Sequence, residues 1–227
     1  MVDSGTSADT GAQVLDDAPI DGVVAVVLAA GAGSRFAGPD HKLLAPLPAT
    51  STRPAESVVA RSLAHCLDAA VGPTVVVTGA ADLDDVIDAA RAERSSMRGG
   101  ADLTAVSNPD WETGQMSSVR CGIGAAAELG AARVVIGLGD QPGVAPSTWR
   151  SIADPGPDAP IVVATYQGRR GNPVSLSSDV WPLLPHEGDQ GARALMQIRP
   201  DLVREVPCDG SAQDIDTVED LQQWQSS

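Results

Sequence analysis

The sequence predicts an α/β fold in three layers, with a mostly parallel sheet that is covered by helices on both faces. Short, continuously apolar segments rich in β-branched residues recur along the chain and alternate with segments whose apolar residues have helical spacing. Strands that are apolar on every residue are typical of a parallel sheet buried on both faces. The 227 residues, 43% of them apolar and 20% charged, suit one such domain with a sizeable core.

The individual elements follow from these two patterns, taken in chain order. Strands are expected where the sequence is apolar and β-branched, at residues 23–30, 74–79, 103–106, 133–140 and 161–166, with a partner strand at 173–176. Helices are expected where apolar or small residues recur at helical spacing, at residues 58–70 behind Pro54, 83–90 and about 115–129, with shorter ones around Trp181 and Ala192. Ligands of such a sheet bind at the carboxyl ends of its strands.

Residues 1–22 are expected to form a disordered acidic tail, and residues 23–227 a single domain. The tail carries five aspartates and no Lys or Arg. A secretory signal would have a basic start and an apolar middle instead. No segment approaches the roughly 20 apolar residues that a membrane helix needs. We therefore expect no membrane partner.

Charge and cysteine content restrict the partners and the compartment. The 30 acidic residues against 15 basic ones give a formal charge of −15, which repels phosphate backbones and anionic lipid at long range. We therefore expect no nucleic-acid partner. Cys66, Cys121 and Cys208 lie far apart and form no CxxC pair, which favours a reducing cytoplasm and argues against a structural zinc.

A glycine-rich turn, GAGSRF at residues 31–36, directly follows the first strand, and Lys42 comes shortly after it. Backbone N–H groups of such a turn can approach an anion closely, as in phosphate sites. A P-loop would need GxxxxGK before Ser or Thr. A dinucleotide fingerprint would need glycine where Phe36 stands and an acidic residue about 20 positions further on. Neither pattern is present.

Two cations accompany this turn, Arg35 and Lys42. Lys42 is the only lysine in a chain with 14 arginines, and its compact ammonium suits a phosphate oxygen. The alternative is a surface lysine in a loop with glycines that merely turn the chain. Their combination behind an apolar strand favours the phosphate interpretation. His41 is a weaker candidate for contact with phosphates.

Carboxylates follow at two other places. Asp140 ends an apolar strand, where sheets of this class present ligands, although it could instead cap the turn that follows. Asp214 and Asp216 flank Ile215, and extended backbone would place both carboxylates on one face with Ile215 turned inward.

The residues after this pair predict a helix start. Thr217 and Asp220 have the spacing of a helix cap, and Leu221 and Trp224 would form the buried side of that helix.

The motifs together resemble the MobA-like NTP transferases, and the later ones resemble the branch of molybdenum cofactor cytidylyltransferases. LAAGAGSRF and KLLAPL come first, and then, in family order, NPDWETGQMSSVRCGI, GLGDQPGV, GRRGNPV, GDQGAR and DIDTVEDL. The resemblance covers nearly all of residues 23–224. It implies a Rossmann-like fold of the nucleotide-diphospho-sugar transferase type.

The resemblance also implies a donor site, a metal site and an acceptor site. The nucleotide-binding residues would come from the glycine turn and from the loop that opens the helix near residue 115: Leu28, Ala29, Ala30, Gly31, Gly33, Ser34, Arg35, Lys42, Gly114, Ser117 and Ser118. The catalytic residues would be Arg35, Lys42 and Asp140. The cofactor would be Mg²⁺ on Asp140 and a second carboxylate, with Asp216 the first choice and Asp214 the second.

The acceptor side is implied at five polar residues: Arg169, Arg170, Asn172, Asp189 and Arg193. The alternative for the arginines is that they are simply solvated, and the alternative for Asp189 is that it caps a helix. For the serines near residue 115, the alternative is close packing of a helix rich in small residues. The chain departs from the family pattern at two places, one on this acceptor side and one after the Lys42 segment. Relatives usually have histidine in place of Asn172, and a tighter glycine turn in place of residues 49–53.

The expected reaction is nucleotidyl transfer, in which an acceptor phosphate attacks the α-phosphorus of an NTP and pyrophosphate leaves. Such an acceptor is already ionised at neutral pH, so no general base is needed. The resemblance implies CTP as the donor, a molybdopterin-type acceptor, and a molybdenum hydroxylase that receives the product. The double alanine of LAAG also favours CTP over GTP. The alternatives are GTP, another phosphorylated acceptor such as a sugar phosphate or phospholactate, and a non-catalytic module that binds or delivers the cofactor.

Overall fold

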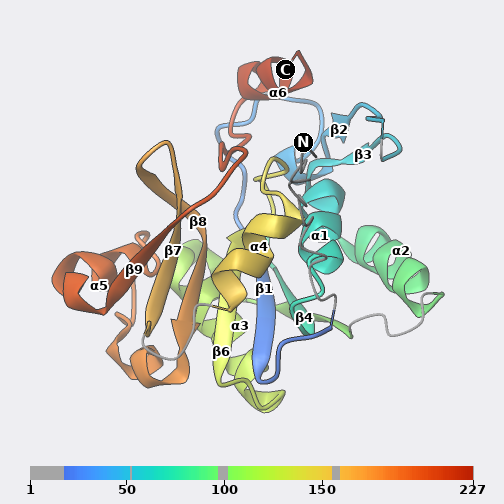
Figure 1. The fold of residues 1–227 in the computed structure, drawn as a ribbon. Helices are drawn as coiled ribbons and strands as arrows, with labels where there is room; N and C mark the ends of the chain where they lie inside the picture. The colour runs from blue at the N-terminus through green and yellow to red at the C-terminus, as the bar shows by residue number, and fades with distance from the viewer. Residues whose placement is uncertain (1–17, 52, 97–101, 155–158, 227) are drawn as a thin grey trace, which may run out of the picture.

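The computed structural model describes residues 18–51, 53–96, 102–154 and 159–226. A seven-stranded sheet in the order β5-β4-β1-β6-β8-β7-β9 forms its centre (Figure 1). These strands are β1 (Val23–Ala29), β4 (Thr74–Thr78), β5 (Leu103–Ser107), β6 (Arg133–Leu138), β7 (Ile161–Tyr166), β8 (Arg169–Ser177) and β9 (Val203–Pro207). A separate short hairpin pairs β2 (Pro46–Leu47) with β3 (Glu56–Ser57).

Helices connect most of the strands. The α-helices are α1 (Val58–Asp68), α2 (Asp84–Ser95), α3 (Gln115–Glu128), α4 (Pro146–Ala153), α5 (Arg193–Ile198) and α6 (Val218–Gln225). The 3₁₀-helices are η1 (Lys42–Leu44), η2 (Trp111–Thr113), η3 (Ser178–Leu183) and η4 (Pro200–Leu202). In the part of the chain that the structure describes, no helix has the length and apolar character needed to cross a membrane.

The sheet is mostly parallel, as predicted. Strands β5, β4, β1 and β6 run parallel, and β9 runs parallel to β7. Strand β8 is antiparallel to both of its neighbours, because it returns from β7 through the two-residue turn Gln167–Gly168. Both turn residues have positive φ, +51° and +77°, which is the backbone of a type I′ hairpin.

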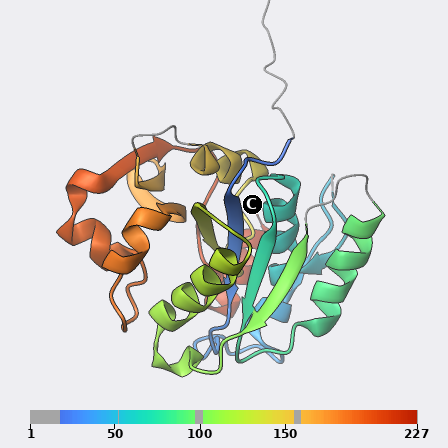
Figure 2. The same cartoon turned by 90° about the horizontal axis from the view of Figure 1, so that it is seen from below.

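The predicted three layers are confirmed by the core. Alternate residues of β1 enter two different apolar clusters, Val23, Ala25, Val27 and Ala29 on one face and Val24, Val26 and Leu28 on the other. Helices α1, α2 and α4 pack on the first face and α3 and α5 on the second. Figure 2 shows the green α2 and the yellow-green α3 on opposite sides of the sheet.

A third, smaller apolar cluster holds the C-terminal segment beside the glycine turn. Its buried members are Ala45, Leu47, Val58, Ile215 and Leu221, and Phe36 and Trp224 pack against them. The guanidinium of Arg61, itself buried, lies 5.7 Å from the ring centroid of Trp224 and pairs with Glu56. Residues far apart in sequence thus meet at one edge of the domain.

The start of α6 agrees with the sequence. Thr217 Oγ1 accepts from the Asp220 N–H at 3.1 Å, and the Asp220 carboxylate accepts from the Thr217 N–H at 2.8 Å, which is a capping box. Ile215 is turned inward and fully buried, as extended backbone predicted.

Several expectations were wrong in detail. Helix α1 begins at Val58, as predicted, but Pro54 lies before its N-cap Ser57 and not in its first turn, and the helix ends at Asp68 instead of residue 70. Strand β8 starts at Arg169, four residues before the predicted 173–176. Asp189 caps no helix, because α5 begins only at Arg193.

Strand β9 and the β2–β3 hairpin were not predicted. Residues of β9 are half-buried or exposed at the sheet edge, so they lack the continuous apolar pattern of the inner strands.

Of the expected tail, residues 1–17 lie outside the described residues. Residues 18–22 contact the domain: the Ile20 N–H donates to the Val71 carbonyl at 2.9 Å, and Arg150 donates to the Ala18 carbonyl at 2.7 Å.

A matched pair of glycines in α3 tests the packing of this helix on the sheet. A Cβ at Gly122 would lie 2.5 Å from Val26 Cγ1, whereas a Cβ at Gly124 would meet nothing within 4 Å. We expect Gly122→Ala to lower the free energy of unfolding in urea by about 1–3 kcal/mol through overpacking. Gly124→Ala should raise it by up to about 1 kcal/mol, because alanine is the better helix former. Equal effects of the two variants would contradict the close contact of α3 with β1.

Candidate functional site

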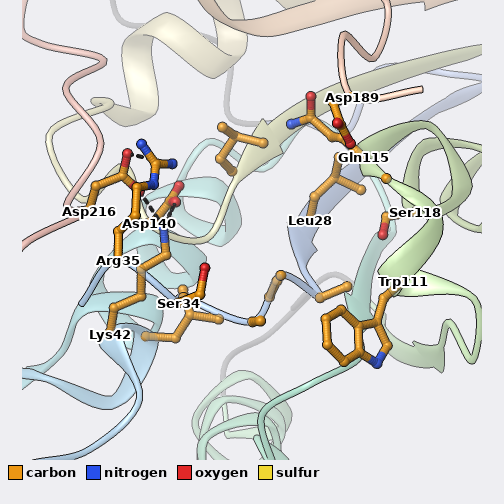
Figure 3. Close-up of a pocket in the computed structure, with 18 of the residues that line it drawn as sticks. Leu28, Ser34, Arg35, Lys42, Trp111, Gln115, Ser118, Asp140, Asp189 and Asp216 are labelled. Carbon is orange, nitrogen blue, oxygen red and sulfur yellow. Dashed lines mark hydrogen bonds and ion pairs between the residues drawn. The ribbon is translucent and has the colours of Figure 1, made fainter. Parts of the chain in front are cut away.

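The predicted site residues gather at the carboxyl ends of β1 and β6, which are neighbours in the sheet. The glycine turn continues β1 and Asp140 follows β6, while Asp216 comes from the segment before α6 (Figure 3). The Ile215 N–H donates to the Asp140 carbonyl at 3.0 Å, so a backbone bond holds the two carboxylate-bearing segments together. This is the edge where sheets of this class bind ligands.

Lys42 joins the two carboxylates. Its Nζ lies 2.6 Å from Asp140 Oδ2 and 2.7 Å from Asp216 Oδ1, and its side chain is only 11% exposed. Arg35 approaches Asp216 from the other side, with Nη2 2.9 Å from Oδ2, but is 75% exposed. Burial alone would lower the pKa of the Lys42 ammonium, yet the two carboxylates outweigh burial and raise it above its ordinary value. Lys42 is therefore a fixed positive charge at neutral pH.

Oxygen atoms suited to a divalent cation are present around this lysine. Asp140 Oδ1 is buried and has no hydrogen-bond partner, although buried carboxylate oxygens are normally paired. Magnesium prefers oxygen ligands and keeps several waters, so two carboxylates and phosphate oxygens are sufficient. Within the described residues no three His, Cys, Asp or Glu side chains converge on one point, so the protein offers two carboxylates rather than a full cage. The residues fit such an ion.

Asp214 is differently placed from Asp216. Its Oδ1 accepts from Gln141 Nε2 at 2.6 Å, and the same amide group donates to the Ala212 carbonyl at 2.8 Å. Burial, with the charges of Asp140 and Asp216, raises the pKa of Asp214. Of the two alternatives left open by the sequence, Asp216 is the carboxylate that shares an ammonium with Asp140.

The glycine turn is held by His41. Its Nδ1 accepts from the Leu43 N–H at 3.2 Å, so Nε2 carries the proton and donates to the Gly31 carbonyl at 3.0 Å. Gly33 has φ +62°, and a Cβ there would lie 3.0 Å from Lys42 Cγ and 3.1 Å from His41 Nε2. Both nitrogens of His41 bind backbone, so His41 shapes the turn and is not free for phosphates.

A cavity of about 350 Å³ opens between the turn and α3. Figure 3 shows Arg35, Lys42 and Asp216 on one side of it and Trp111, Gln115 and Ser118 on the other. The predicted nucleotide-binding residues that line this donor-side cavity are Leu28, Ala29, Ala30, Gly31, Gly33, Ser34, Arg35, Lys42, Gly114 and Ser118. Asp140 and Asp216 line it too.

Ser117 is the predicted nucleotide-binding residue that does not line the donor-side cavity. Its Oγ accepts from Asn108 Nδ2 at 2.9 Å and lies 2.9 Å from the Asp110 and Gly114 carbonyls, so it braces the local loop. The Met116 N–H, at the start of α3, is also occupied, because it donates to the Gly188 carbonyl at 3.0 Å. This N–H group at the start of α3 is therefore not free to bind an anion.

Asn108 was missed by the sequence interpretation. It is 4% exposed, donates to the hydroxyls of Ser117 and Ser118, and accepts from the Asp110 N–H at 3.0 Å. The last bond is an Asx turn, for which Asn before Pro is a recognisable signal. Asn108 thus fixes the wall of the cavity that contains Gly114 and Ser118.

A second cavity of about 540 Å³ lies on the other side of Lys42. Four of the five predicted acceptor residues line this acceptor-side cavity: Arg170, Asn172, Asp189 and Arg193. Apolar side chains contribute to its wall, among them Val119, Ile136, Val163, Val174 and Met196. Arg169 does not line it and is exposed. Arg35, Lys42, Asp140 and Asp216 border both cavities, which therefore meet at the carboxylate pair.

Tyr166, the only tyrosine, was also missed. Its hydroxyl donates to the Asn172 carbonyl at 2.7 Å, and a Cβ at Gly171 would lie 3.1 Å from its ring. Burial raises the pKa of this phenol well above its usual range, so it remains a donor. Tyr166 positions the strand that carries Arg170 and Asn172.

The seven-stranded sheet with helices on both faces has the fold of the nucleotide-diphospho-sugar transferase type, which confirms the predicted fold class. The chain belongs to the MobA-like NTP transferase domain family, whose profile matches residues 25–206.

Solved structures similar to the chain support this assignment. Rv0371c of Mycobacterium tuberculosis H37Rv is 30% identical, with a TM-score of 0.65 over 90% of this chain and 98% of that one. It has also been solved in complex with manganese. Mth528, a nucleotidyl transferase from Methanothermobacter thermautotroptrophicus, is 25% identical, with a TM-score of 0.71 over 91% of this chain and 97% of that one.

Among curated proteins, the purine catabolism protein PucB of Bacillus subtilis is 33% identical over 115 residues. The match covers 49% of this chain and 56% of PucB, so it spans little more than half of that relative.

Replacing Asn108 tests its role in the cavity wall. Asn108→Ala removes the partner of two hydroxyls and of a backbone N–H inside the protein, so we expect the free energy of unfolding to fall by about 1–3 kcal/mol. Ser117→Ala is the matched control. In this variant Asn108 still donates to the Ser118 hydroxyl, so the free energy of unfolding should fall less. Urea titration followed by circular dichroism measures both. An Asn108→Ala variant as stable as the wild type would contradict the bracing role.

Proposed function

We propose that this MobA-like nucleotidyltransferase transfers CMP from CTP to the phosphate of a molybdopterin-type acceptor. We propose that the enzyme is cytoplasmic and that residues 23–227 form its catalytic domain. The proposed receiver of the product is a molybdenum hydroxylase. The observation that carries the proposal is the carboxylate pair Asp140 and Asp216, which shares one ammonium where two cavities meet. A donor and an acceptor phosphate can approach such a point from opposite sides.

The donor side is proposed to take the nucleotide in the 350 Å³ cavity. The N–H groups of the glycine turn, Arg35 and Lys42 would stabilise the pyrophosphate that leaves. CTP is favoured over GTP by Ala29–Ala30 and by the resemblance to cytidylyltransferases.

Asp140 and Asp216 would hold the divalent cation, with the unpartnered Asp140 Oδ1 available to it. Mg²⁺, when bound, would neutralise charge on the reacting phosphates. The manganese complex of Rv0371c supports the binding of a divalent ion.

The acceptor side is proposed to lie in the 540 Å³ cavity. Arg170 and Arg193 supply positive charge for a phosphate, and the apolar wall suits a ring system. Arg170 pairs with Glu205 at the surface, 2.7 Å apart, and would exchange this partner for the acceptor. A sugar phosphate or phospholactate is the alternative acceptor.

The protein's part in the reaction is positioning and charge neutralisation. The acceptor phosphate oxygen forms a bond to the α-phosphorus while the bond to the β-phosphate oxygen breaks. No histidine is among the described residues that line the two cavities, which agrees with an acceptor that needs no general base.

Turnover of site variants tests the proposal. Pyrophosphate release is measured with CTP, GTP, ATP and UTP against molybdopterin-type, sugar-phosphate and phospholactate acceptors. We expect Lys42→Ala, Asp140→Ala and Asp216→Ala each to lower kcat by about 10²–10³, because each removes an electrostatic contact at the reacting phosphates.

Asp214→Ala is the matched control, and its kcat should fall less, because the Asp214 carboxylate is hydrogen-bonded to Gln141. Melting temperatures check the fold. Near-wild-type turnover of Lys42→Ala or Asp140→Ala would refute the proposed site, and tight cofactor binding without turnover would indicate a delivery module instead.

Tyr166→Phe tests the acceptor side separately. The loss of one hydrogen bond to Asn172 should raise the acceptor KM by about two- to tenfold and leave the CTP KM and kcat unchanged. Trp181→Phe is the control, because it removes a similar bond, from Nε1 to the Leu176 carbonyl at 3.2 Å, at the other end of the same strand. Equal effects of Tyr166→Phe on both substrates would show a general structural role.

A further inference from the structure

We propose that the Lys42 ammonium occupies the cation position between Asp140 and Asp216 in the nucleotide-free protein, and that a divalent cation gains this position when the ammonium passes to the nucleotide phosphates. Metal and nucleotide then bind with positive coupling, each favouring the other. The inference rests on the proposed function, since it deepens the role of the same site.

The position of Nζ is the first observation. It lies 2.6 and 2.7 Å from one oxygen of each carboxylate, at the short end of charge-assisted hydrogen bonds. A magnesium ion that drew on both carboxylates would sit about 2.0–2.1 Å from their oxygens. Such an ion and the ammonium would compete for the same small space and repel each other strongly. The two cations therefore exclude one another.

The second observation is the oxygen that the lysine leaves unused. Asp140 Oδ1 is buried without a partner, while Oδ2 accepts from Lys42. An ammonium satisfies only one oxygen of Asp140, whereas a divalent cation has ligand positions to spare. The pair is thus incompletely satisfied by Lys42 alone, which favours exchange for a stronger cation.

The third observation is the surroundings of the lysine. Its side chain is largely buried, so moving it away from both carboxylates without a new anion would leave a poorly solvated charge. The glycine turn lies directly beside it, since a Cβ at Gly33 would come within 3.0 Å of Lys42 Cγ. Phosphates bound at this turn would give the ammonium its new partner. Nucleotide binding therefore releases the carboxylates.

Arg35 provides a matched control within the same cluster. It also carries one positive charge and also pairs with Asp216, through Oδ2 at 2.9 Å. It is exposed, however, and within the described residues the ion pair that it forms is with Asp216 and not with Asp140. Removing Arg35 changes the charge of the site without opening the position between the carboxylates.

The test uses Mn²⁺ alone as the probe, without nucleotide. Binding to the full chain is followed by the electron paramagnetic resonance signal of free Mn²⁺. We expect Lys42→Met to bind Mn²⁺ about tenfold more tightly than the wild type, a factor typical of coupled sites. Arg35→Met should change the affinity by less than about threefold. Asp140→Asn added to Lys42→Met should abolish the gain, which shows that the ion is at this site.

Two results would overturn the inference. One is a Lys42→Met variant that keeps its fold, by melting temperature, and binds Mn²⁺ no better than the wild type. The other is an Arg35→Met variant that gains as much affinity as Lys42→Met, since charge alone would then explain the effect.

A crystal structure of the wild type with Mn²⁺ and CTP tests the nucleotide step. Nζ should contact a phosphate oxygen, and Nζ still between both carboxylates would also overturn the inference. The Mn²⁺ titration separates this inference from the proposed function. A gain of Mn²⁺ affinity in Lys42→Met, together with no turnover by the wild type on any donor and acceptor pair, would refute the proposed function alone.

Discussion

The ion pairs of Lys42 with Asp140 and Asp216 are the interaction on which the arrangement of the site depends. Asp140 and Asp216 lie 98 and 174 positions from Lys42 in the sequence, and the ammonium of Lys42 joins them. In a chain with a net charge of −15, two largely buried carboxylates side by side need a cation between them. The single lysine provides it. In the proposed reaction the same charge also meets the incoming phosphates. One side chain would then both stabilise the unliganded site and bind the nucleotide.

The sheet topology turns this pair into a two-sided site. Strands β1 and β6 are adjacent and parallel, which brings the glycine turn and Asp140 to one edge. Strand β8 runs antiparallel beside β6 and carries Arg170 and Asn172 to the acceptor-side cavity. The donor-side cavity lies toward α3. Because the two cavities share the carboxylates, substrates could meet there without any movement of the sheet.

The packing of the C-terminal segment determines whether the site is complete. Asp216 reaches Lys42 because Ile215, Leu221 and Trp224 pack against the segment that follows the glycine turn. Two further interactions reinforce this contact: the packing of the Arg61 guanidinium over the Trp224 ring, and the backbone hydrogen bond from the Ile215 N–H to the Asp140 carbonyl. A small apolar cluster distant from the main core thus supports the charged groups. Changes in this cluster would act on the site through the position of Asp216.

The sequence by itself determined the class of fold, the glycine turn and the end of β6, because continuous apolar strands, glycines and strand-end carboxylates are local signals. It also determined the capping box at Thr217, whose partners are three residues apart. The edge strand β9, the brace at Asn108 and the distinction between Asp214 and Asp216 were decided only in three dimensions. Each depends on a partner from elsewhere in the chain, and so does the placement of Ser117 and Arg169 outside the cavities. Local residue patterns specify which groups can bind an anion or a cation, whereas the tertiary structure selects which of them meet.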